Sequence, residues 1–163
     1  MWTLSATALR EAFDHSFAQA IAPNDDALDD HLALRLAQAP YAVRLAEVAC
    51  LLPWREPTFL PSSVPALMGL MSHRGSLLPV YDLPAVMGHG PRQRPPEWLL
   101  IVAGRPLAFA VDVFEAHLRL PRRMQDDTVA APDGLRPLIP LTALAAAMPA
   151  SHPQAVPTSP KED

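Results

Sequence analysis

The stretch Gly69-Leu-Met-Ser-His-Arg-Gly-Ser-Leu-Leu-Pro-Val-Tyr-Asp-Leu83 consists of two apolar halves separated by the polar pair Arg74-Gly75. The first half predicts a short helix over Ala66–Met71, because the proline before it suits the first helical position, where a missing N–H costs nothing. The second half predicts a strand over Leu77–Tyr81, after which Asp82 is placed to cap a helical turn. The segment therefore predicts short elements joined by tight turns.

The region before this stretch changes to a period of two, which is typical of half-buried strands. Leucines alternate with other residues over Leu32–Leu36, and apolar residues alternate again over Tyr41–Leu45. The pair Ala39–Pro40 predicts the turn between them, so the two segments form a hairpin. The apolar run Val48–Leu52 predicts a further strand, which a proline ends.

A second hairpin is predicted after the central stretch. Trp98–Ala103 is a continuous apolar run, Gly104–Arg105 predicts a tight turn, and Leu107–Val113 alternates on the way back. The remaining elements are a short strand at Leu118–Leu120, a loop over Asp126–Gly134, a short apolar segment at Leu138–Leu141 and a helix that Thr142 caps and that continues to about Met148.

Many short strands and few small helices favour a mainly β fold, a barrel or sandwich, over an α/β nucleotide-binding fold. The expected organisation is an N-terminal helix and acidic linker over residues 1–30, a β domain over 31–148 and a disordered proline-rich tail over 149–163. The helix is predicted by an apolar stripe at four-residue spacing, formed by Leu9, Phe13, Phe17 and Ile21. This stripe either packs on the body of the protein or docks a partner.

The composition excludes several classes of protein. The chain has 163 residues with 20 prolines, 6 glycines and a formal net charge of −4, which gives no reason to expect nucleic-acid binding. It has one cysteine, so no internal disulfide forms, which fits a reducing cytosol. We recognise neither a signal peptide nor an apolar run long enough for a membrane span, so a cytoplasmic protein is expected.

A search for chemistry finds no catalytic constellation, metal site or cofactor motif. Neither of the glycine-rich phosphate-binding motifs is present. Six histidines lack the spacing of metal ligands on a helical turn; they are His15, His31, His73, His89, His117 and His152. Cys50 lies in an apolar segment without a neighbouring cation, which predicts a buried structural thiol.

Two aspartates and two small clusters of arginines have ordinary structural explanations. Asp82 and Asp112 each follow apolar strand residues, so we expect them to cap turns or end strands, although paired carboxylates also serve in acid–base catalysis. The small basic groups Arg92/Arg94 and Arg119/Arg122/Arg123 are expected to be solvated loop charges. We therefore expect a non-enzymatic protein without a cofactor.

The central stretch resembles the signature of the CheW-like domain. In that family a short helix ends in glycine and is followed by two apolar residues, by Asn-Leu-Arg-Gly and by a strand reading Pro-Val-x-Asp-Leu. Tyr41-Ala-Val43-Arg-Leu45, with Val48 and Leu51, resembles the family's Tyr-Ala-Ile-Pro-Ile…Val-x-Glu-Ile hairpin. Ala108-Phe-Ala-Val111-Asp112-Val113 resembles its Gly-Leu-x-Val-Asp-x-Val strand. The three matches occur in the family's order and span roughly Leu32 to Leu120.

The resemblance implies two small SH3-like β-barrels and a non-catalytic chemotaxis adaptor. CheW-like proteins couple the cytoplasmic tips of methyl-accepting chemoreceptors to the regulatory domain of a histidine kinase. Arg74 and Gly75 match the Arg-Gly turn, whose arginine lies in the receptor-binding groove between the barrels. Val48 matches an apolar receptor-facing position, with Leu45 and Leu51 close by. An alternative, compatible role for Arg74 is to bridge the two barrels and hold their loops.

Departures from the family pattern leave other functions open. Ser72-His73 stands where the family has Asn-Leu, and Cys50 stands at an acidic position. The short stretch between Leu120 and Leu138 suggests that strands of one barrel are missing or rebuilt. A second hypothesis is therefore a CheW-like fold used as an inhibitor or as an adaptor for one partner. A third is a small ligand-binding or enzymatic barrel that uses His73, Asp82 or Asp112.

Overall fold

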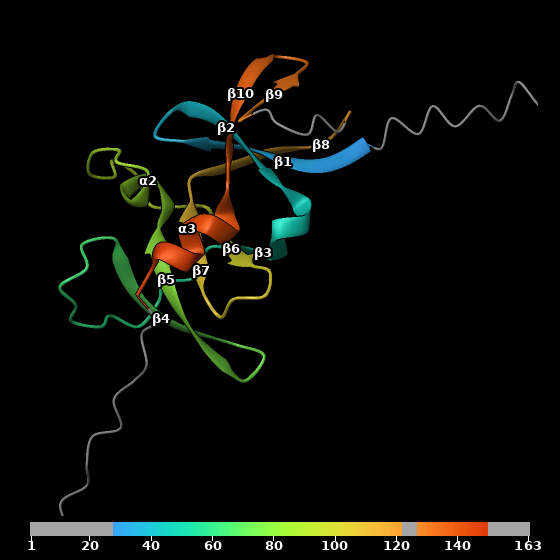
Figure 1. Ribbon diagram of the computed structural model, residues 1–163. Helices are drawn as coiled ribbons and strands as arrows, with labels where there is room; N and C mark the ends of the chain where they lie inside the picture. The colour runs from blue at the N-terminus through green and yellow to red at the C-terminus, as the bar shows by residue number, and fades with distance from the viewer. Residues whose placement is uncertain (1–27, 122–126, 150–163) are drawn as a thin grey trace, which may run out of the picture.

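The computed structural model describes residues 28–121 and 127–149, which form two five-stranded sheets (Figure 1). Sheet 1 has the strand order β8-β1-β2-β10-β9, and sheet 2 has the order β3-β6-β7-β5-β4. Short helical segments connect or flank these strands. The predicted N-terminal helix and proline-rich tail lie outside the described residues. The mainly β prediction is confirmed.

In chain order the elements are β1 (Leu28–Leu36), β2 (Ala39–Arg44), the 3₁₀ turn η1 (Leu45–Glu47), β3 (Val48–Pro53), β4 (Leu67–His73), β5 (Ser76–Asp82), α2 (Leu83–Val86), β6 (Trp98–Val102), β7 (Ala108–Val111), β8 (Val113–Pro121), β9 (Thr128–Ala131), β10 (Gly134–Ile139) and α3 (Leu141–Ala147).

The first hairpin, β1–β2, forms as predicted but turns two residues earlier. Ala37 and Gln38 have φ values of 47° and 73°, and Leu36 pairs with Ala39 across this two-residue turn. Both central residues of such a turn need positive φ, whereas proline has its φ fixed near −65°. The prediction of a turn at Ala39–Pro40 is therefore wrong, because these residues begin β2. The first strand begins at Leu28, inside the acidic run that was expected to be a linker.

The end of sheet 1 contains more strand than the sequence predicts. β8 extends over nine residues and pairs with β1, so the predicted short strand at Leu118–Leu120 is only its last part. β9 is four residues long and lies inside the stretch Asp126–Gly134, where a loop is predicted, and it pairs with β10. β10 in turn runs parallel to β2. The short stretch before Leu138 therefore still supplies two strands.

Residues 67–71 belong to strand β4, so the predicted helix over Ala66–Met71 is wrong. β4 pairs with β5 along its length, from Leu67 opposite Tyr81 to His73 opposite Ser76. On its other side the backbone of Leu70 exchanges hydrogen bonds of 2.7 and 2.8 Å with Thr58. These pairings satisfy backbone groups that a single helical turn would leave largely unpaired, and tertiary pairing overrides the weak local signal of Pro65.

The two predicted helix caps differ in detail from the structure. Asp82 stands at the N-cap position of α2, but its carboxylate makes no cap hydrogen bond. α3 begins at Leu141, with Pro140 at its N-cap, so Thr142 does not cap it. Instead, the Glu47 carboxylate accepts hydrogen bonds from the Leu141 N–H at 3.1 Å and from the Thr142 hydroxyl. A side chain from η1 therefore caps the C-terminal helix.

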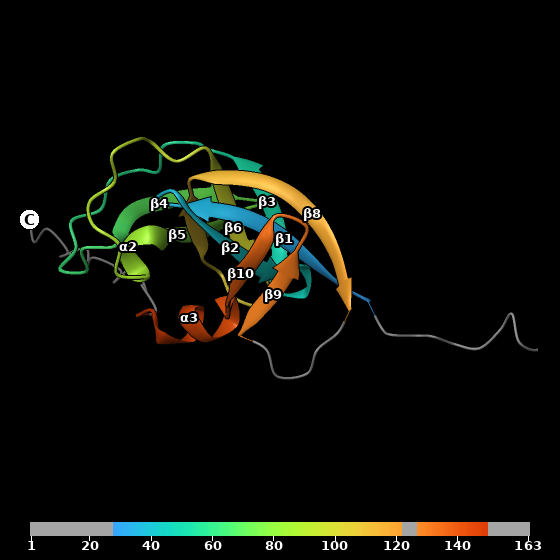
Figure 2. The ribbon, with the colours of Figure 1, turned by 90° about the horizontal axis from the view of Figure 1, so that it is seen from above.

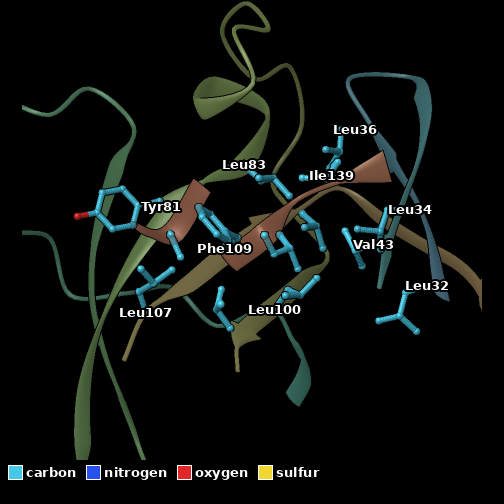
Figure 3. Packing of buried hydrophobic residues seen from close by; sticks show 14 residues of the cluster. Leu32, Leu34, Leu36, Val43, Tyr81, Leu83, Leu100, Leu107, Phe109 and Ile139 are labelled. Carbon is cyan, nitrogen blue, oxygen red and sulfur yellow. The ribbon is translucent and has the colours of Figure 1, made fainter. Parts of the chain in front are cut away.

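The sheets share one hydrophobic core, and sheet 2 has a second core on its other face. The shared core has fourteen buried residues, drawn in Figure 3: Leu32, Leu34, Leu36, Val43, Tyr81, Leu83, Leu100, Val102, Leu107, Phe109, Val111, Ile139, Leu141 and Ala145. In β7, Phe109 and Val111 face this core, whereas Ala108 and Ala110 face the second one. Both faces of the central strands are thus covered, which explains why Trp98–Val102 is continuously apolar. Figure 2 shows α3 along one side of the domain, beside β10.

A buried arginine ties sheet 1 together. Arg136 of β10 is 4% exposed, donates to the carbonyl of Leu34 at 3.2 Å and pairs with Glu115 of β8 at 2.7 Å and with Asp133. Glu115 also accepts from Arg35 at 2.6 and 2.9 Å. Burial alone would raise the pKa of Glu115, but hydrogen bonds from Arg35 and Arg136 hold that pKa below its ordinary value. The hydrogen bond from Arg136 likewise lowers the pKa of Asp133. Buried charges are tolerated because they are paired in this way.

Candidate partner-binding surface

The residues Arg74 and Gly75 form the exposed tip of the β4–β5 hairpin. They are the two central residues of the turn between His73 and Ser76, with φ values of 50° and 80°. This conformation matches the tight hairpin turn whose twist suits neighbouring strands, and glycine is favoured in it. The backbone therefore holds the Arg74 side chain at a fixed, solvent-exposed place.

The guanidinium group of Arg74 has no partner in the part of the chain that the structure describes. Within residues 28–121 and 127–149 it makes no hydrogen bond, ion pair or ring contact. No contact in this part of the chain therefore supports the alternative role, in which Arg74 bridges the barrels and holds their loops. An arginine held this way offers five N–H donors to a carboxylate or to carbonyl groups.

Three further candidates, Leu45, Val48 and Leu51, form a second feature that we call the apolar rim. All three are half-buried and pack against the shared core. Val48 and Leu51 lie three residues apart, so a regular strand would direct them to opposite faces. A β-bulge between Val48 and Cys50 shifts the register of β3 against β6 and returns both side chains to one face. The structure thus brings these three residues together.

The strand pairing places the apolar rim and the hairpin tip at the same end of sheet 2. β3 begins at Val48, opposite Val102 at the end of β6. β7 begins at Ala108, which pairs with Val80 in the middle of β5. From there the β4–β5 hairpin extends a further four residues to Ser76. In Figure 1, η1, the β6–β7 turn and the hairpin tip succeed one another along this end of the sheet. The two features stand on opposite edge strands of one sheet.

The hairpin also exposes an apolar residue that the sequence did not single out. Leu77 of β5 is 60% exposed. It lines a shallow cleft of about 370 Å³ together with Thr58, Leu70, Met71 and Ser72. Exposed apolar side chains beside a groove are typical of interaction surfaces. The sequence did not predict this exposure, because Leu77 and Leu78 are adjacent and point to opposite faces of the strand, and the pattern does not show which of the two is buried.

The three residues of the enzymatic hypothesis do not come together. His73 flanks the hairpin tip, whereas Asp82 ends β5 and Asp112 follows β7 at the opposite end of the sheet. Six residues of extended chain between Ser76 and Asp82 span about 20 Å. In the two described ranges no group of three or more His, Cys, Asp and Glu side chains is arranged to hold a metal ion.

Asp82 and Asp112 share one partner, Arg92, which was expected to be a solvated loop charge. The guanidinium of Arg92 hydrogen-bonds to the carboxylates of both Asp82 and Asp112, and its side chain is only 13% exposed. Arg92 is therefore not a solvated loop charge. Arg119 is 66% exposed and lies 3.5 Å from Asp30, so the surface description holds for it. Arg122 and Arg123 lie outside the described residues.

Cys50 is half-buried rather than fully buried. It packs with Leu52, Trp54 and Met68 against the second core, and its thiol lies 3.9 Å from the carbonyl of Leu51. Its partners are apolar, as a structural cysteine requires. It faces away from the apolar rim, because the bulge separates the two sets of residues.

These features define a class: a mainly β domain of two sheets around a shared core, with an exposed arginine turn and an apolar rim at one end. The model of the CheW-like domain matches residues 30–145, well over half of the chain, and the chain belongs to that family. The family consists of non-catalytic scaffold and adaptor proteins of chemotaxis signal transduction, in agreement with the expectation of a non-enzyme.

A solved structure supports the fold assignment. The crystal structure of the scaffolding protein TtCheW from Thermoanaerobacter tengcongensis is 20% identical to this chain and superposes with a TM-score of 0.62. The match covers 72% of this chain and 92% of that chain. At this identity the likeness concerns the fold alone. No curated protein matches the chain. None of the helices in the described ranges has the length and apolar content needed to cross a membrane.

Proposed function

We propose that this protein is a non-catalytic cytoplasmic scaffold that couples methyl-accepting chemoreceptors to a chemosensory histidine kinase. Its two partners are the cytoplasmic tip of the receptor and the regulatory domain of the kinase. Membership of the CheW-like family supports the adaptor role. The similar fold of the scaffolding protein TtCheW is consistent with this role. The output of the pathway is chemotaxis or the motility of type IV pili.

The observation that carries the receptor contact is the Arg74 guanidinium, which stands on a tight hairpin turn and has no partner within residues 28–121 and 127–149. A receptor tip is a helical hairpin, which offers carboxylates along its surface and carbonyl groups at its helix ends. Arginine binds such oxygens through two parallel hydrogen bonds, which fixes orientation as well as adding affinity. Because the turn backbone is already ordered, Arg74 loses little backbone entropy on binding.

The apolar rim supports the same proposal. Leu45, Val48 and Leu51 rest on the shared core, and each keeps part of its side chain accessible. A supported apolar surface of this kind accepts the apolar face of an amphipathic helix. We further propose that the two sheets correspond to the two SH3-like barrels of the family. The groove between the barrels would then be bordered by η1.

The test is co-sedimentation of the protein with a receptor signalling fragment and the kinase. Arg74→Glu should lower receptor binding about tenfold or more, because the change removes a paired cation and adds repulsion. The matched control is Arg94→Glu, the same charge change at an exposed residue near the start of β6, the other end of sheet 2. Circular dichroism establishes that both variants fold. If the wild type binds neither partner, the coupling function is wrong.

The alternative is a CheW-like protein that serves one partner, as an inhibitor or a dedicated adaptor. Ser72-His73 beside the hairpin tip and Cys50 in β3 depart from the family pattern, and these departures favour a changed contact. The same assay separates the two proposals: a scaffold sediments with both partners and joins them in one complex. A dedicated adaptor sediments with only one of them.

A further inference from the structure

Asp112 occupies the point where the chain passes from sheet 2 to sheet 1. It lies between β7, which ends at Val111, and β8, which begins at Val113. One carboxylate oxygen accepts the N–H of Ala37 at 2.6 Å, and the other accepts a hydrogen bond from Arg92. Ala37 belongs to the β1–β2 turn of sheet 1, whereas Arg92 lies in the loop between α2 and β6 of sheet 2. One side chain therefore binds both sheets.

Arg92 binds a second carboxylate from sheet 2. It donates to Asp82 at the end of β5 and, at 3.4 Å, to the carbonyl of Ala110 in β7. Two carboxylates therefore share one guanidinium, and removing the guanidinium would leave them facing each other without a cation. Two carboxylates that bind the same guanidinium repel each other, and part-burial makes the repulsion stronger than in water. Arg92 therefore neutralises both carboxylates, Asp82 and Asp112.

A second tie connects the same loop to sheet 1. The hydroxyl of Tyr41 in β2 lies 2.9 Å from Nε2 of His89, and the two rings meet edge-on with centroids 5.8 Å apart. Between this loop and the β1–β2 turn lies a cleft of about 400 Å³. The cleft leaves the loop without close packing on that side, so the polar ties must hold it.

We propose that Arg92, Asp82 and Asp112, together with the Ala37 N–H, form a latch that fixes the position of sheet 1 relative to sheet 2. Arg92 is the positioning residue of this latch, since it acts on sheet 1 only through Asp112. The latch also stabilises the β1–β2 turn, whose two central residues have positive φ without being glycine. The latch lies wholly within the domain and acts without any partner.

The first measurement is amide hydrogen exchange. In Arg92→Ala the Ala37 amide should exchange at least about tenfold faster, because its carboxylate acceptor is no longer held. The amide of Leu100, in the centre of β6, should keep its relative protection and so reports that the domain remains folded. Arg94→Ala is the matched control, because Arg94 lies in the same loop but is exposed. Equal exchange at Ala37 in both variants would overturn the latch.

The second measurement reads the arrangement of the sheets directly. Spin labels at the exposed residues Ser76 in sheet 2 and Ala130 in sheet 1, in a Cys50→Ala background, report the distance between the sheets. The distance distribution should broaden or shift in Arg92→Ala and stay narrow in Arg94→Ala. An unchanged distribution in Arg92→Ala would contradict the positioning role.

Two conservative variants keep the test decisive if Arg92→Ala does not fold. Arg92→Lys keeps the charge but has no planar guanidinium to reach both carboxylates. Compared with Arg92→Ala, it should therefore recover more of the stability of the domain than of the hydrogen-exchange protection at the Ala37 amide. Asp82→Asn should leave the Ala37 amide protected, because it removes only the sheet 2 carboxylate. Loss of Ala37 protection in Asp82→Asn and not in Arg92→Lys would refute the proposed order of contacts.

Discussion

Replacement of Gly69 by alanine should destabilise the domain more than any other single methyl addition to its described glycines. Gly69 has a φ of 149°, a conformation that side chains rarely adopt. A Cβ at this position would lie 2.2 Å from the carbonyl oxygen of Thr58 and 2.9 Å from its carbonyl carbon. Both obstacles are backbone atoms, so no side-chain rotation relieves the clash.

The expected loss is about 2 to 6 kcal/mol in the free energy of unfolding. The strained backbone conformation accounts for about 1 to 3 kcal/mol. Relief of the clash requires the Thr58 segment to leave β4, which breaks the two hydrogen bonds to Leu70, each contributing about 0.5 to 1.5 kcal/mol net. Such a loss is a large share of the total stability of an ordinary domain.

The assay is chemical denaturation, and the structure supplies a matched control. Gly75→Ala makes the same methyl addition at a φ of 80°, with no atom within 4 Å of the new Cβ. It should cost only the strain, about 1 to 2 kcal/mol. The difference between the two variants isolates the contact with Thr58. If Gly69→Ala loses no more stability than Gly75→Ala, the close approach of Thr58 to β4 is refuted.

The remaining predictions concern pH, a cap and the core. The pKa values of Glu115 and Asp133 are lowered in the folded state. The pairing of these carboxylates with Arg136 therefore stabilises the domain fully at pH values above their unfolded pKa values of 4.5 and 3.8. This stabilisation is lost as the pH falls through the lower pKa values of the folded state. Denaturation at several pH values should therefore show that the stability gap between wild type and Arg136→Met narrows in acid, and a gap independent of pH would contradict this. Glu47→Ala should cost about 1 to 2 kcal/mol, because α3 loses the acceptor of its first N–H, and an unchanged denaturation midpoint would show that the cap contributes nothing. Phe109→Ala should cost about 3 to 5 kcal/mol by the same assay, since its ring is fully buried in the shared core, and a loss below about 1 kcal/mol would place it outside a close-packed region.

Predictions from periodicity succeeded where strand neighbours are close in sequence. The alternation over Leu32–Leu36 and Tyr41–Leu45 correctly indicated a hairpin, and the apolar run Trp98–Ala103 correctly indicated a strand. Successive side chains of a strand point to opposite faces, so the order of apolar and polar residues shows which face meets the core. The motif around Arg74-Gly75 also identified the family.

Predictions failed where the structure depends on partners distant in the chain. Residues 67–71 form a strand because β5 and Thr58 pair with them, and the sequence around Pro65 does not encode those neighbours. The 128–131 stretch is a strand because β10 pairs with it. Propensity is a weak prior that such pairing overrides.

The candidate site divides in the same way. The sequence by itself predicted Arg74, Gly75, Leu45, Val48 and Leu51 as partner-binding residues, through their resemblance to the CheW-like signature. Only the tertiary structure shows that Arg74 has no partner among the described residues, that a bulge places Val48 and Leu51 on one face, and that Arg92 joins Asp82 and Asp112. Local spacing sets which face a side chain takes along a strand, whereas a charge finds its partner only after the sheets pack and exclude water. That last step depends on contacts between residues far apart in the chain.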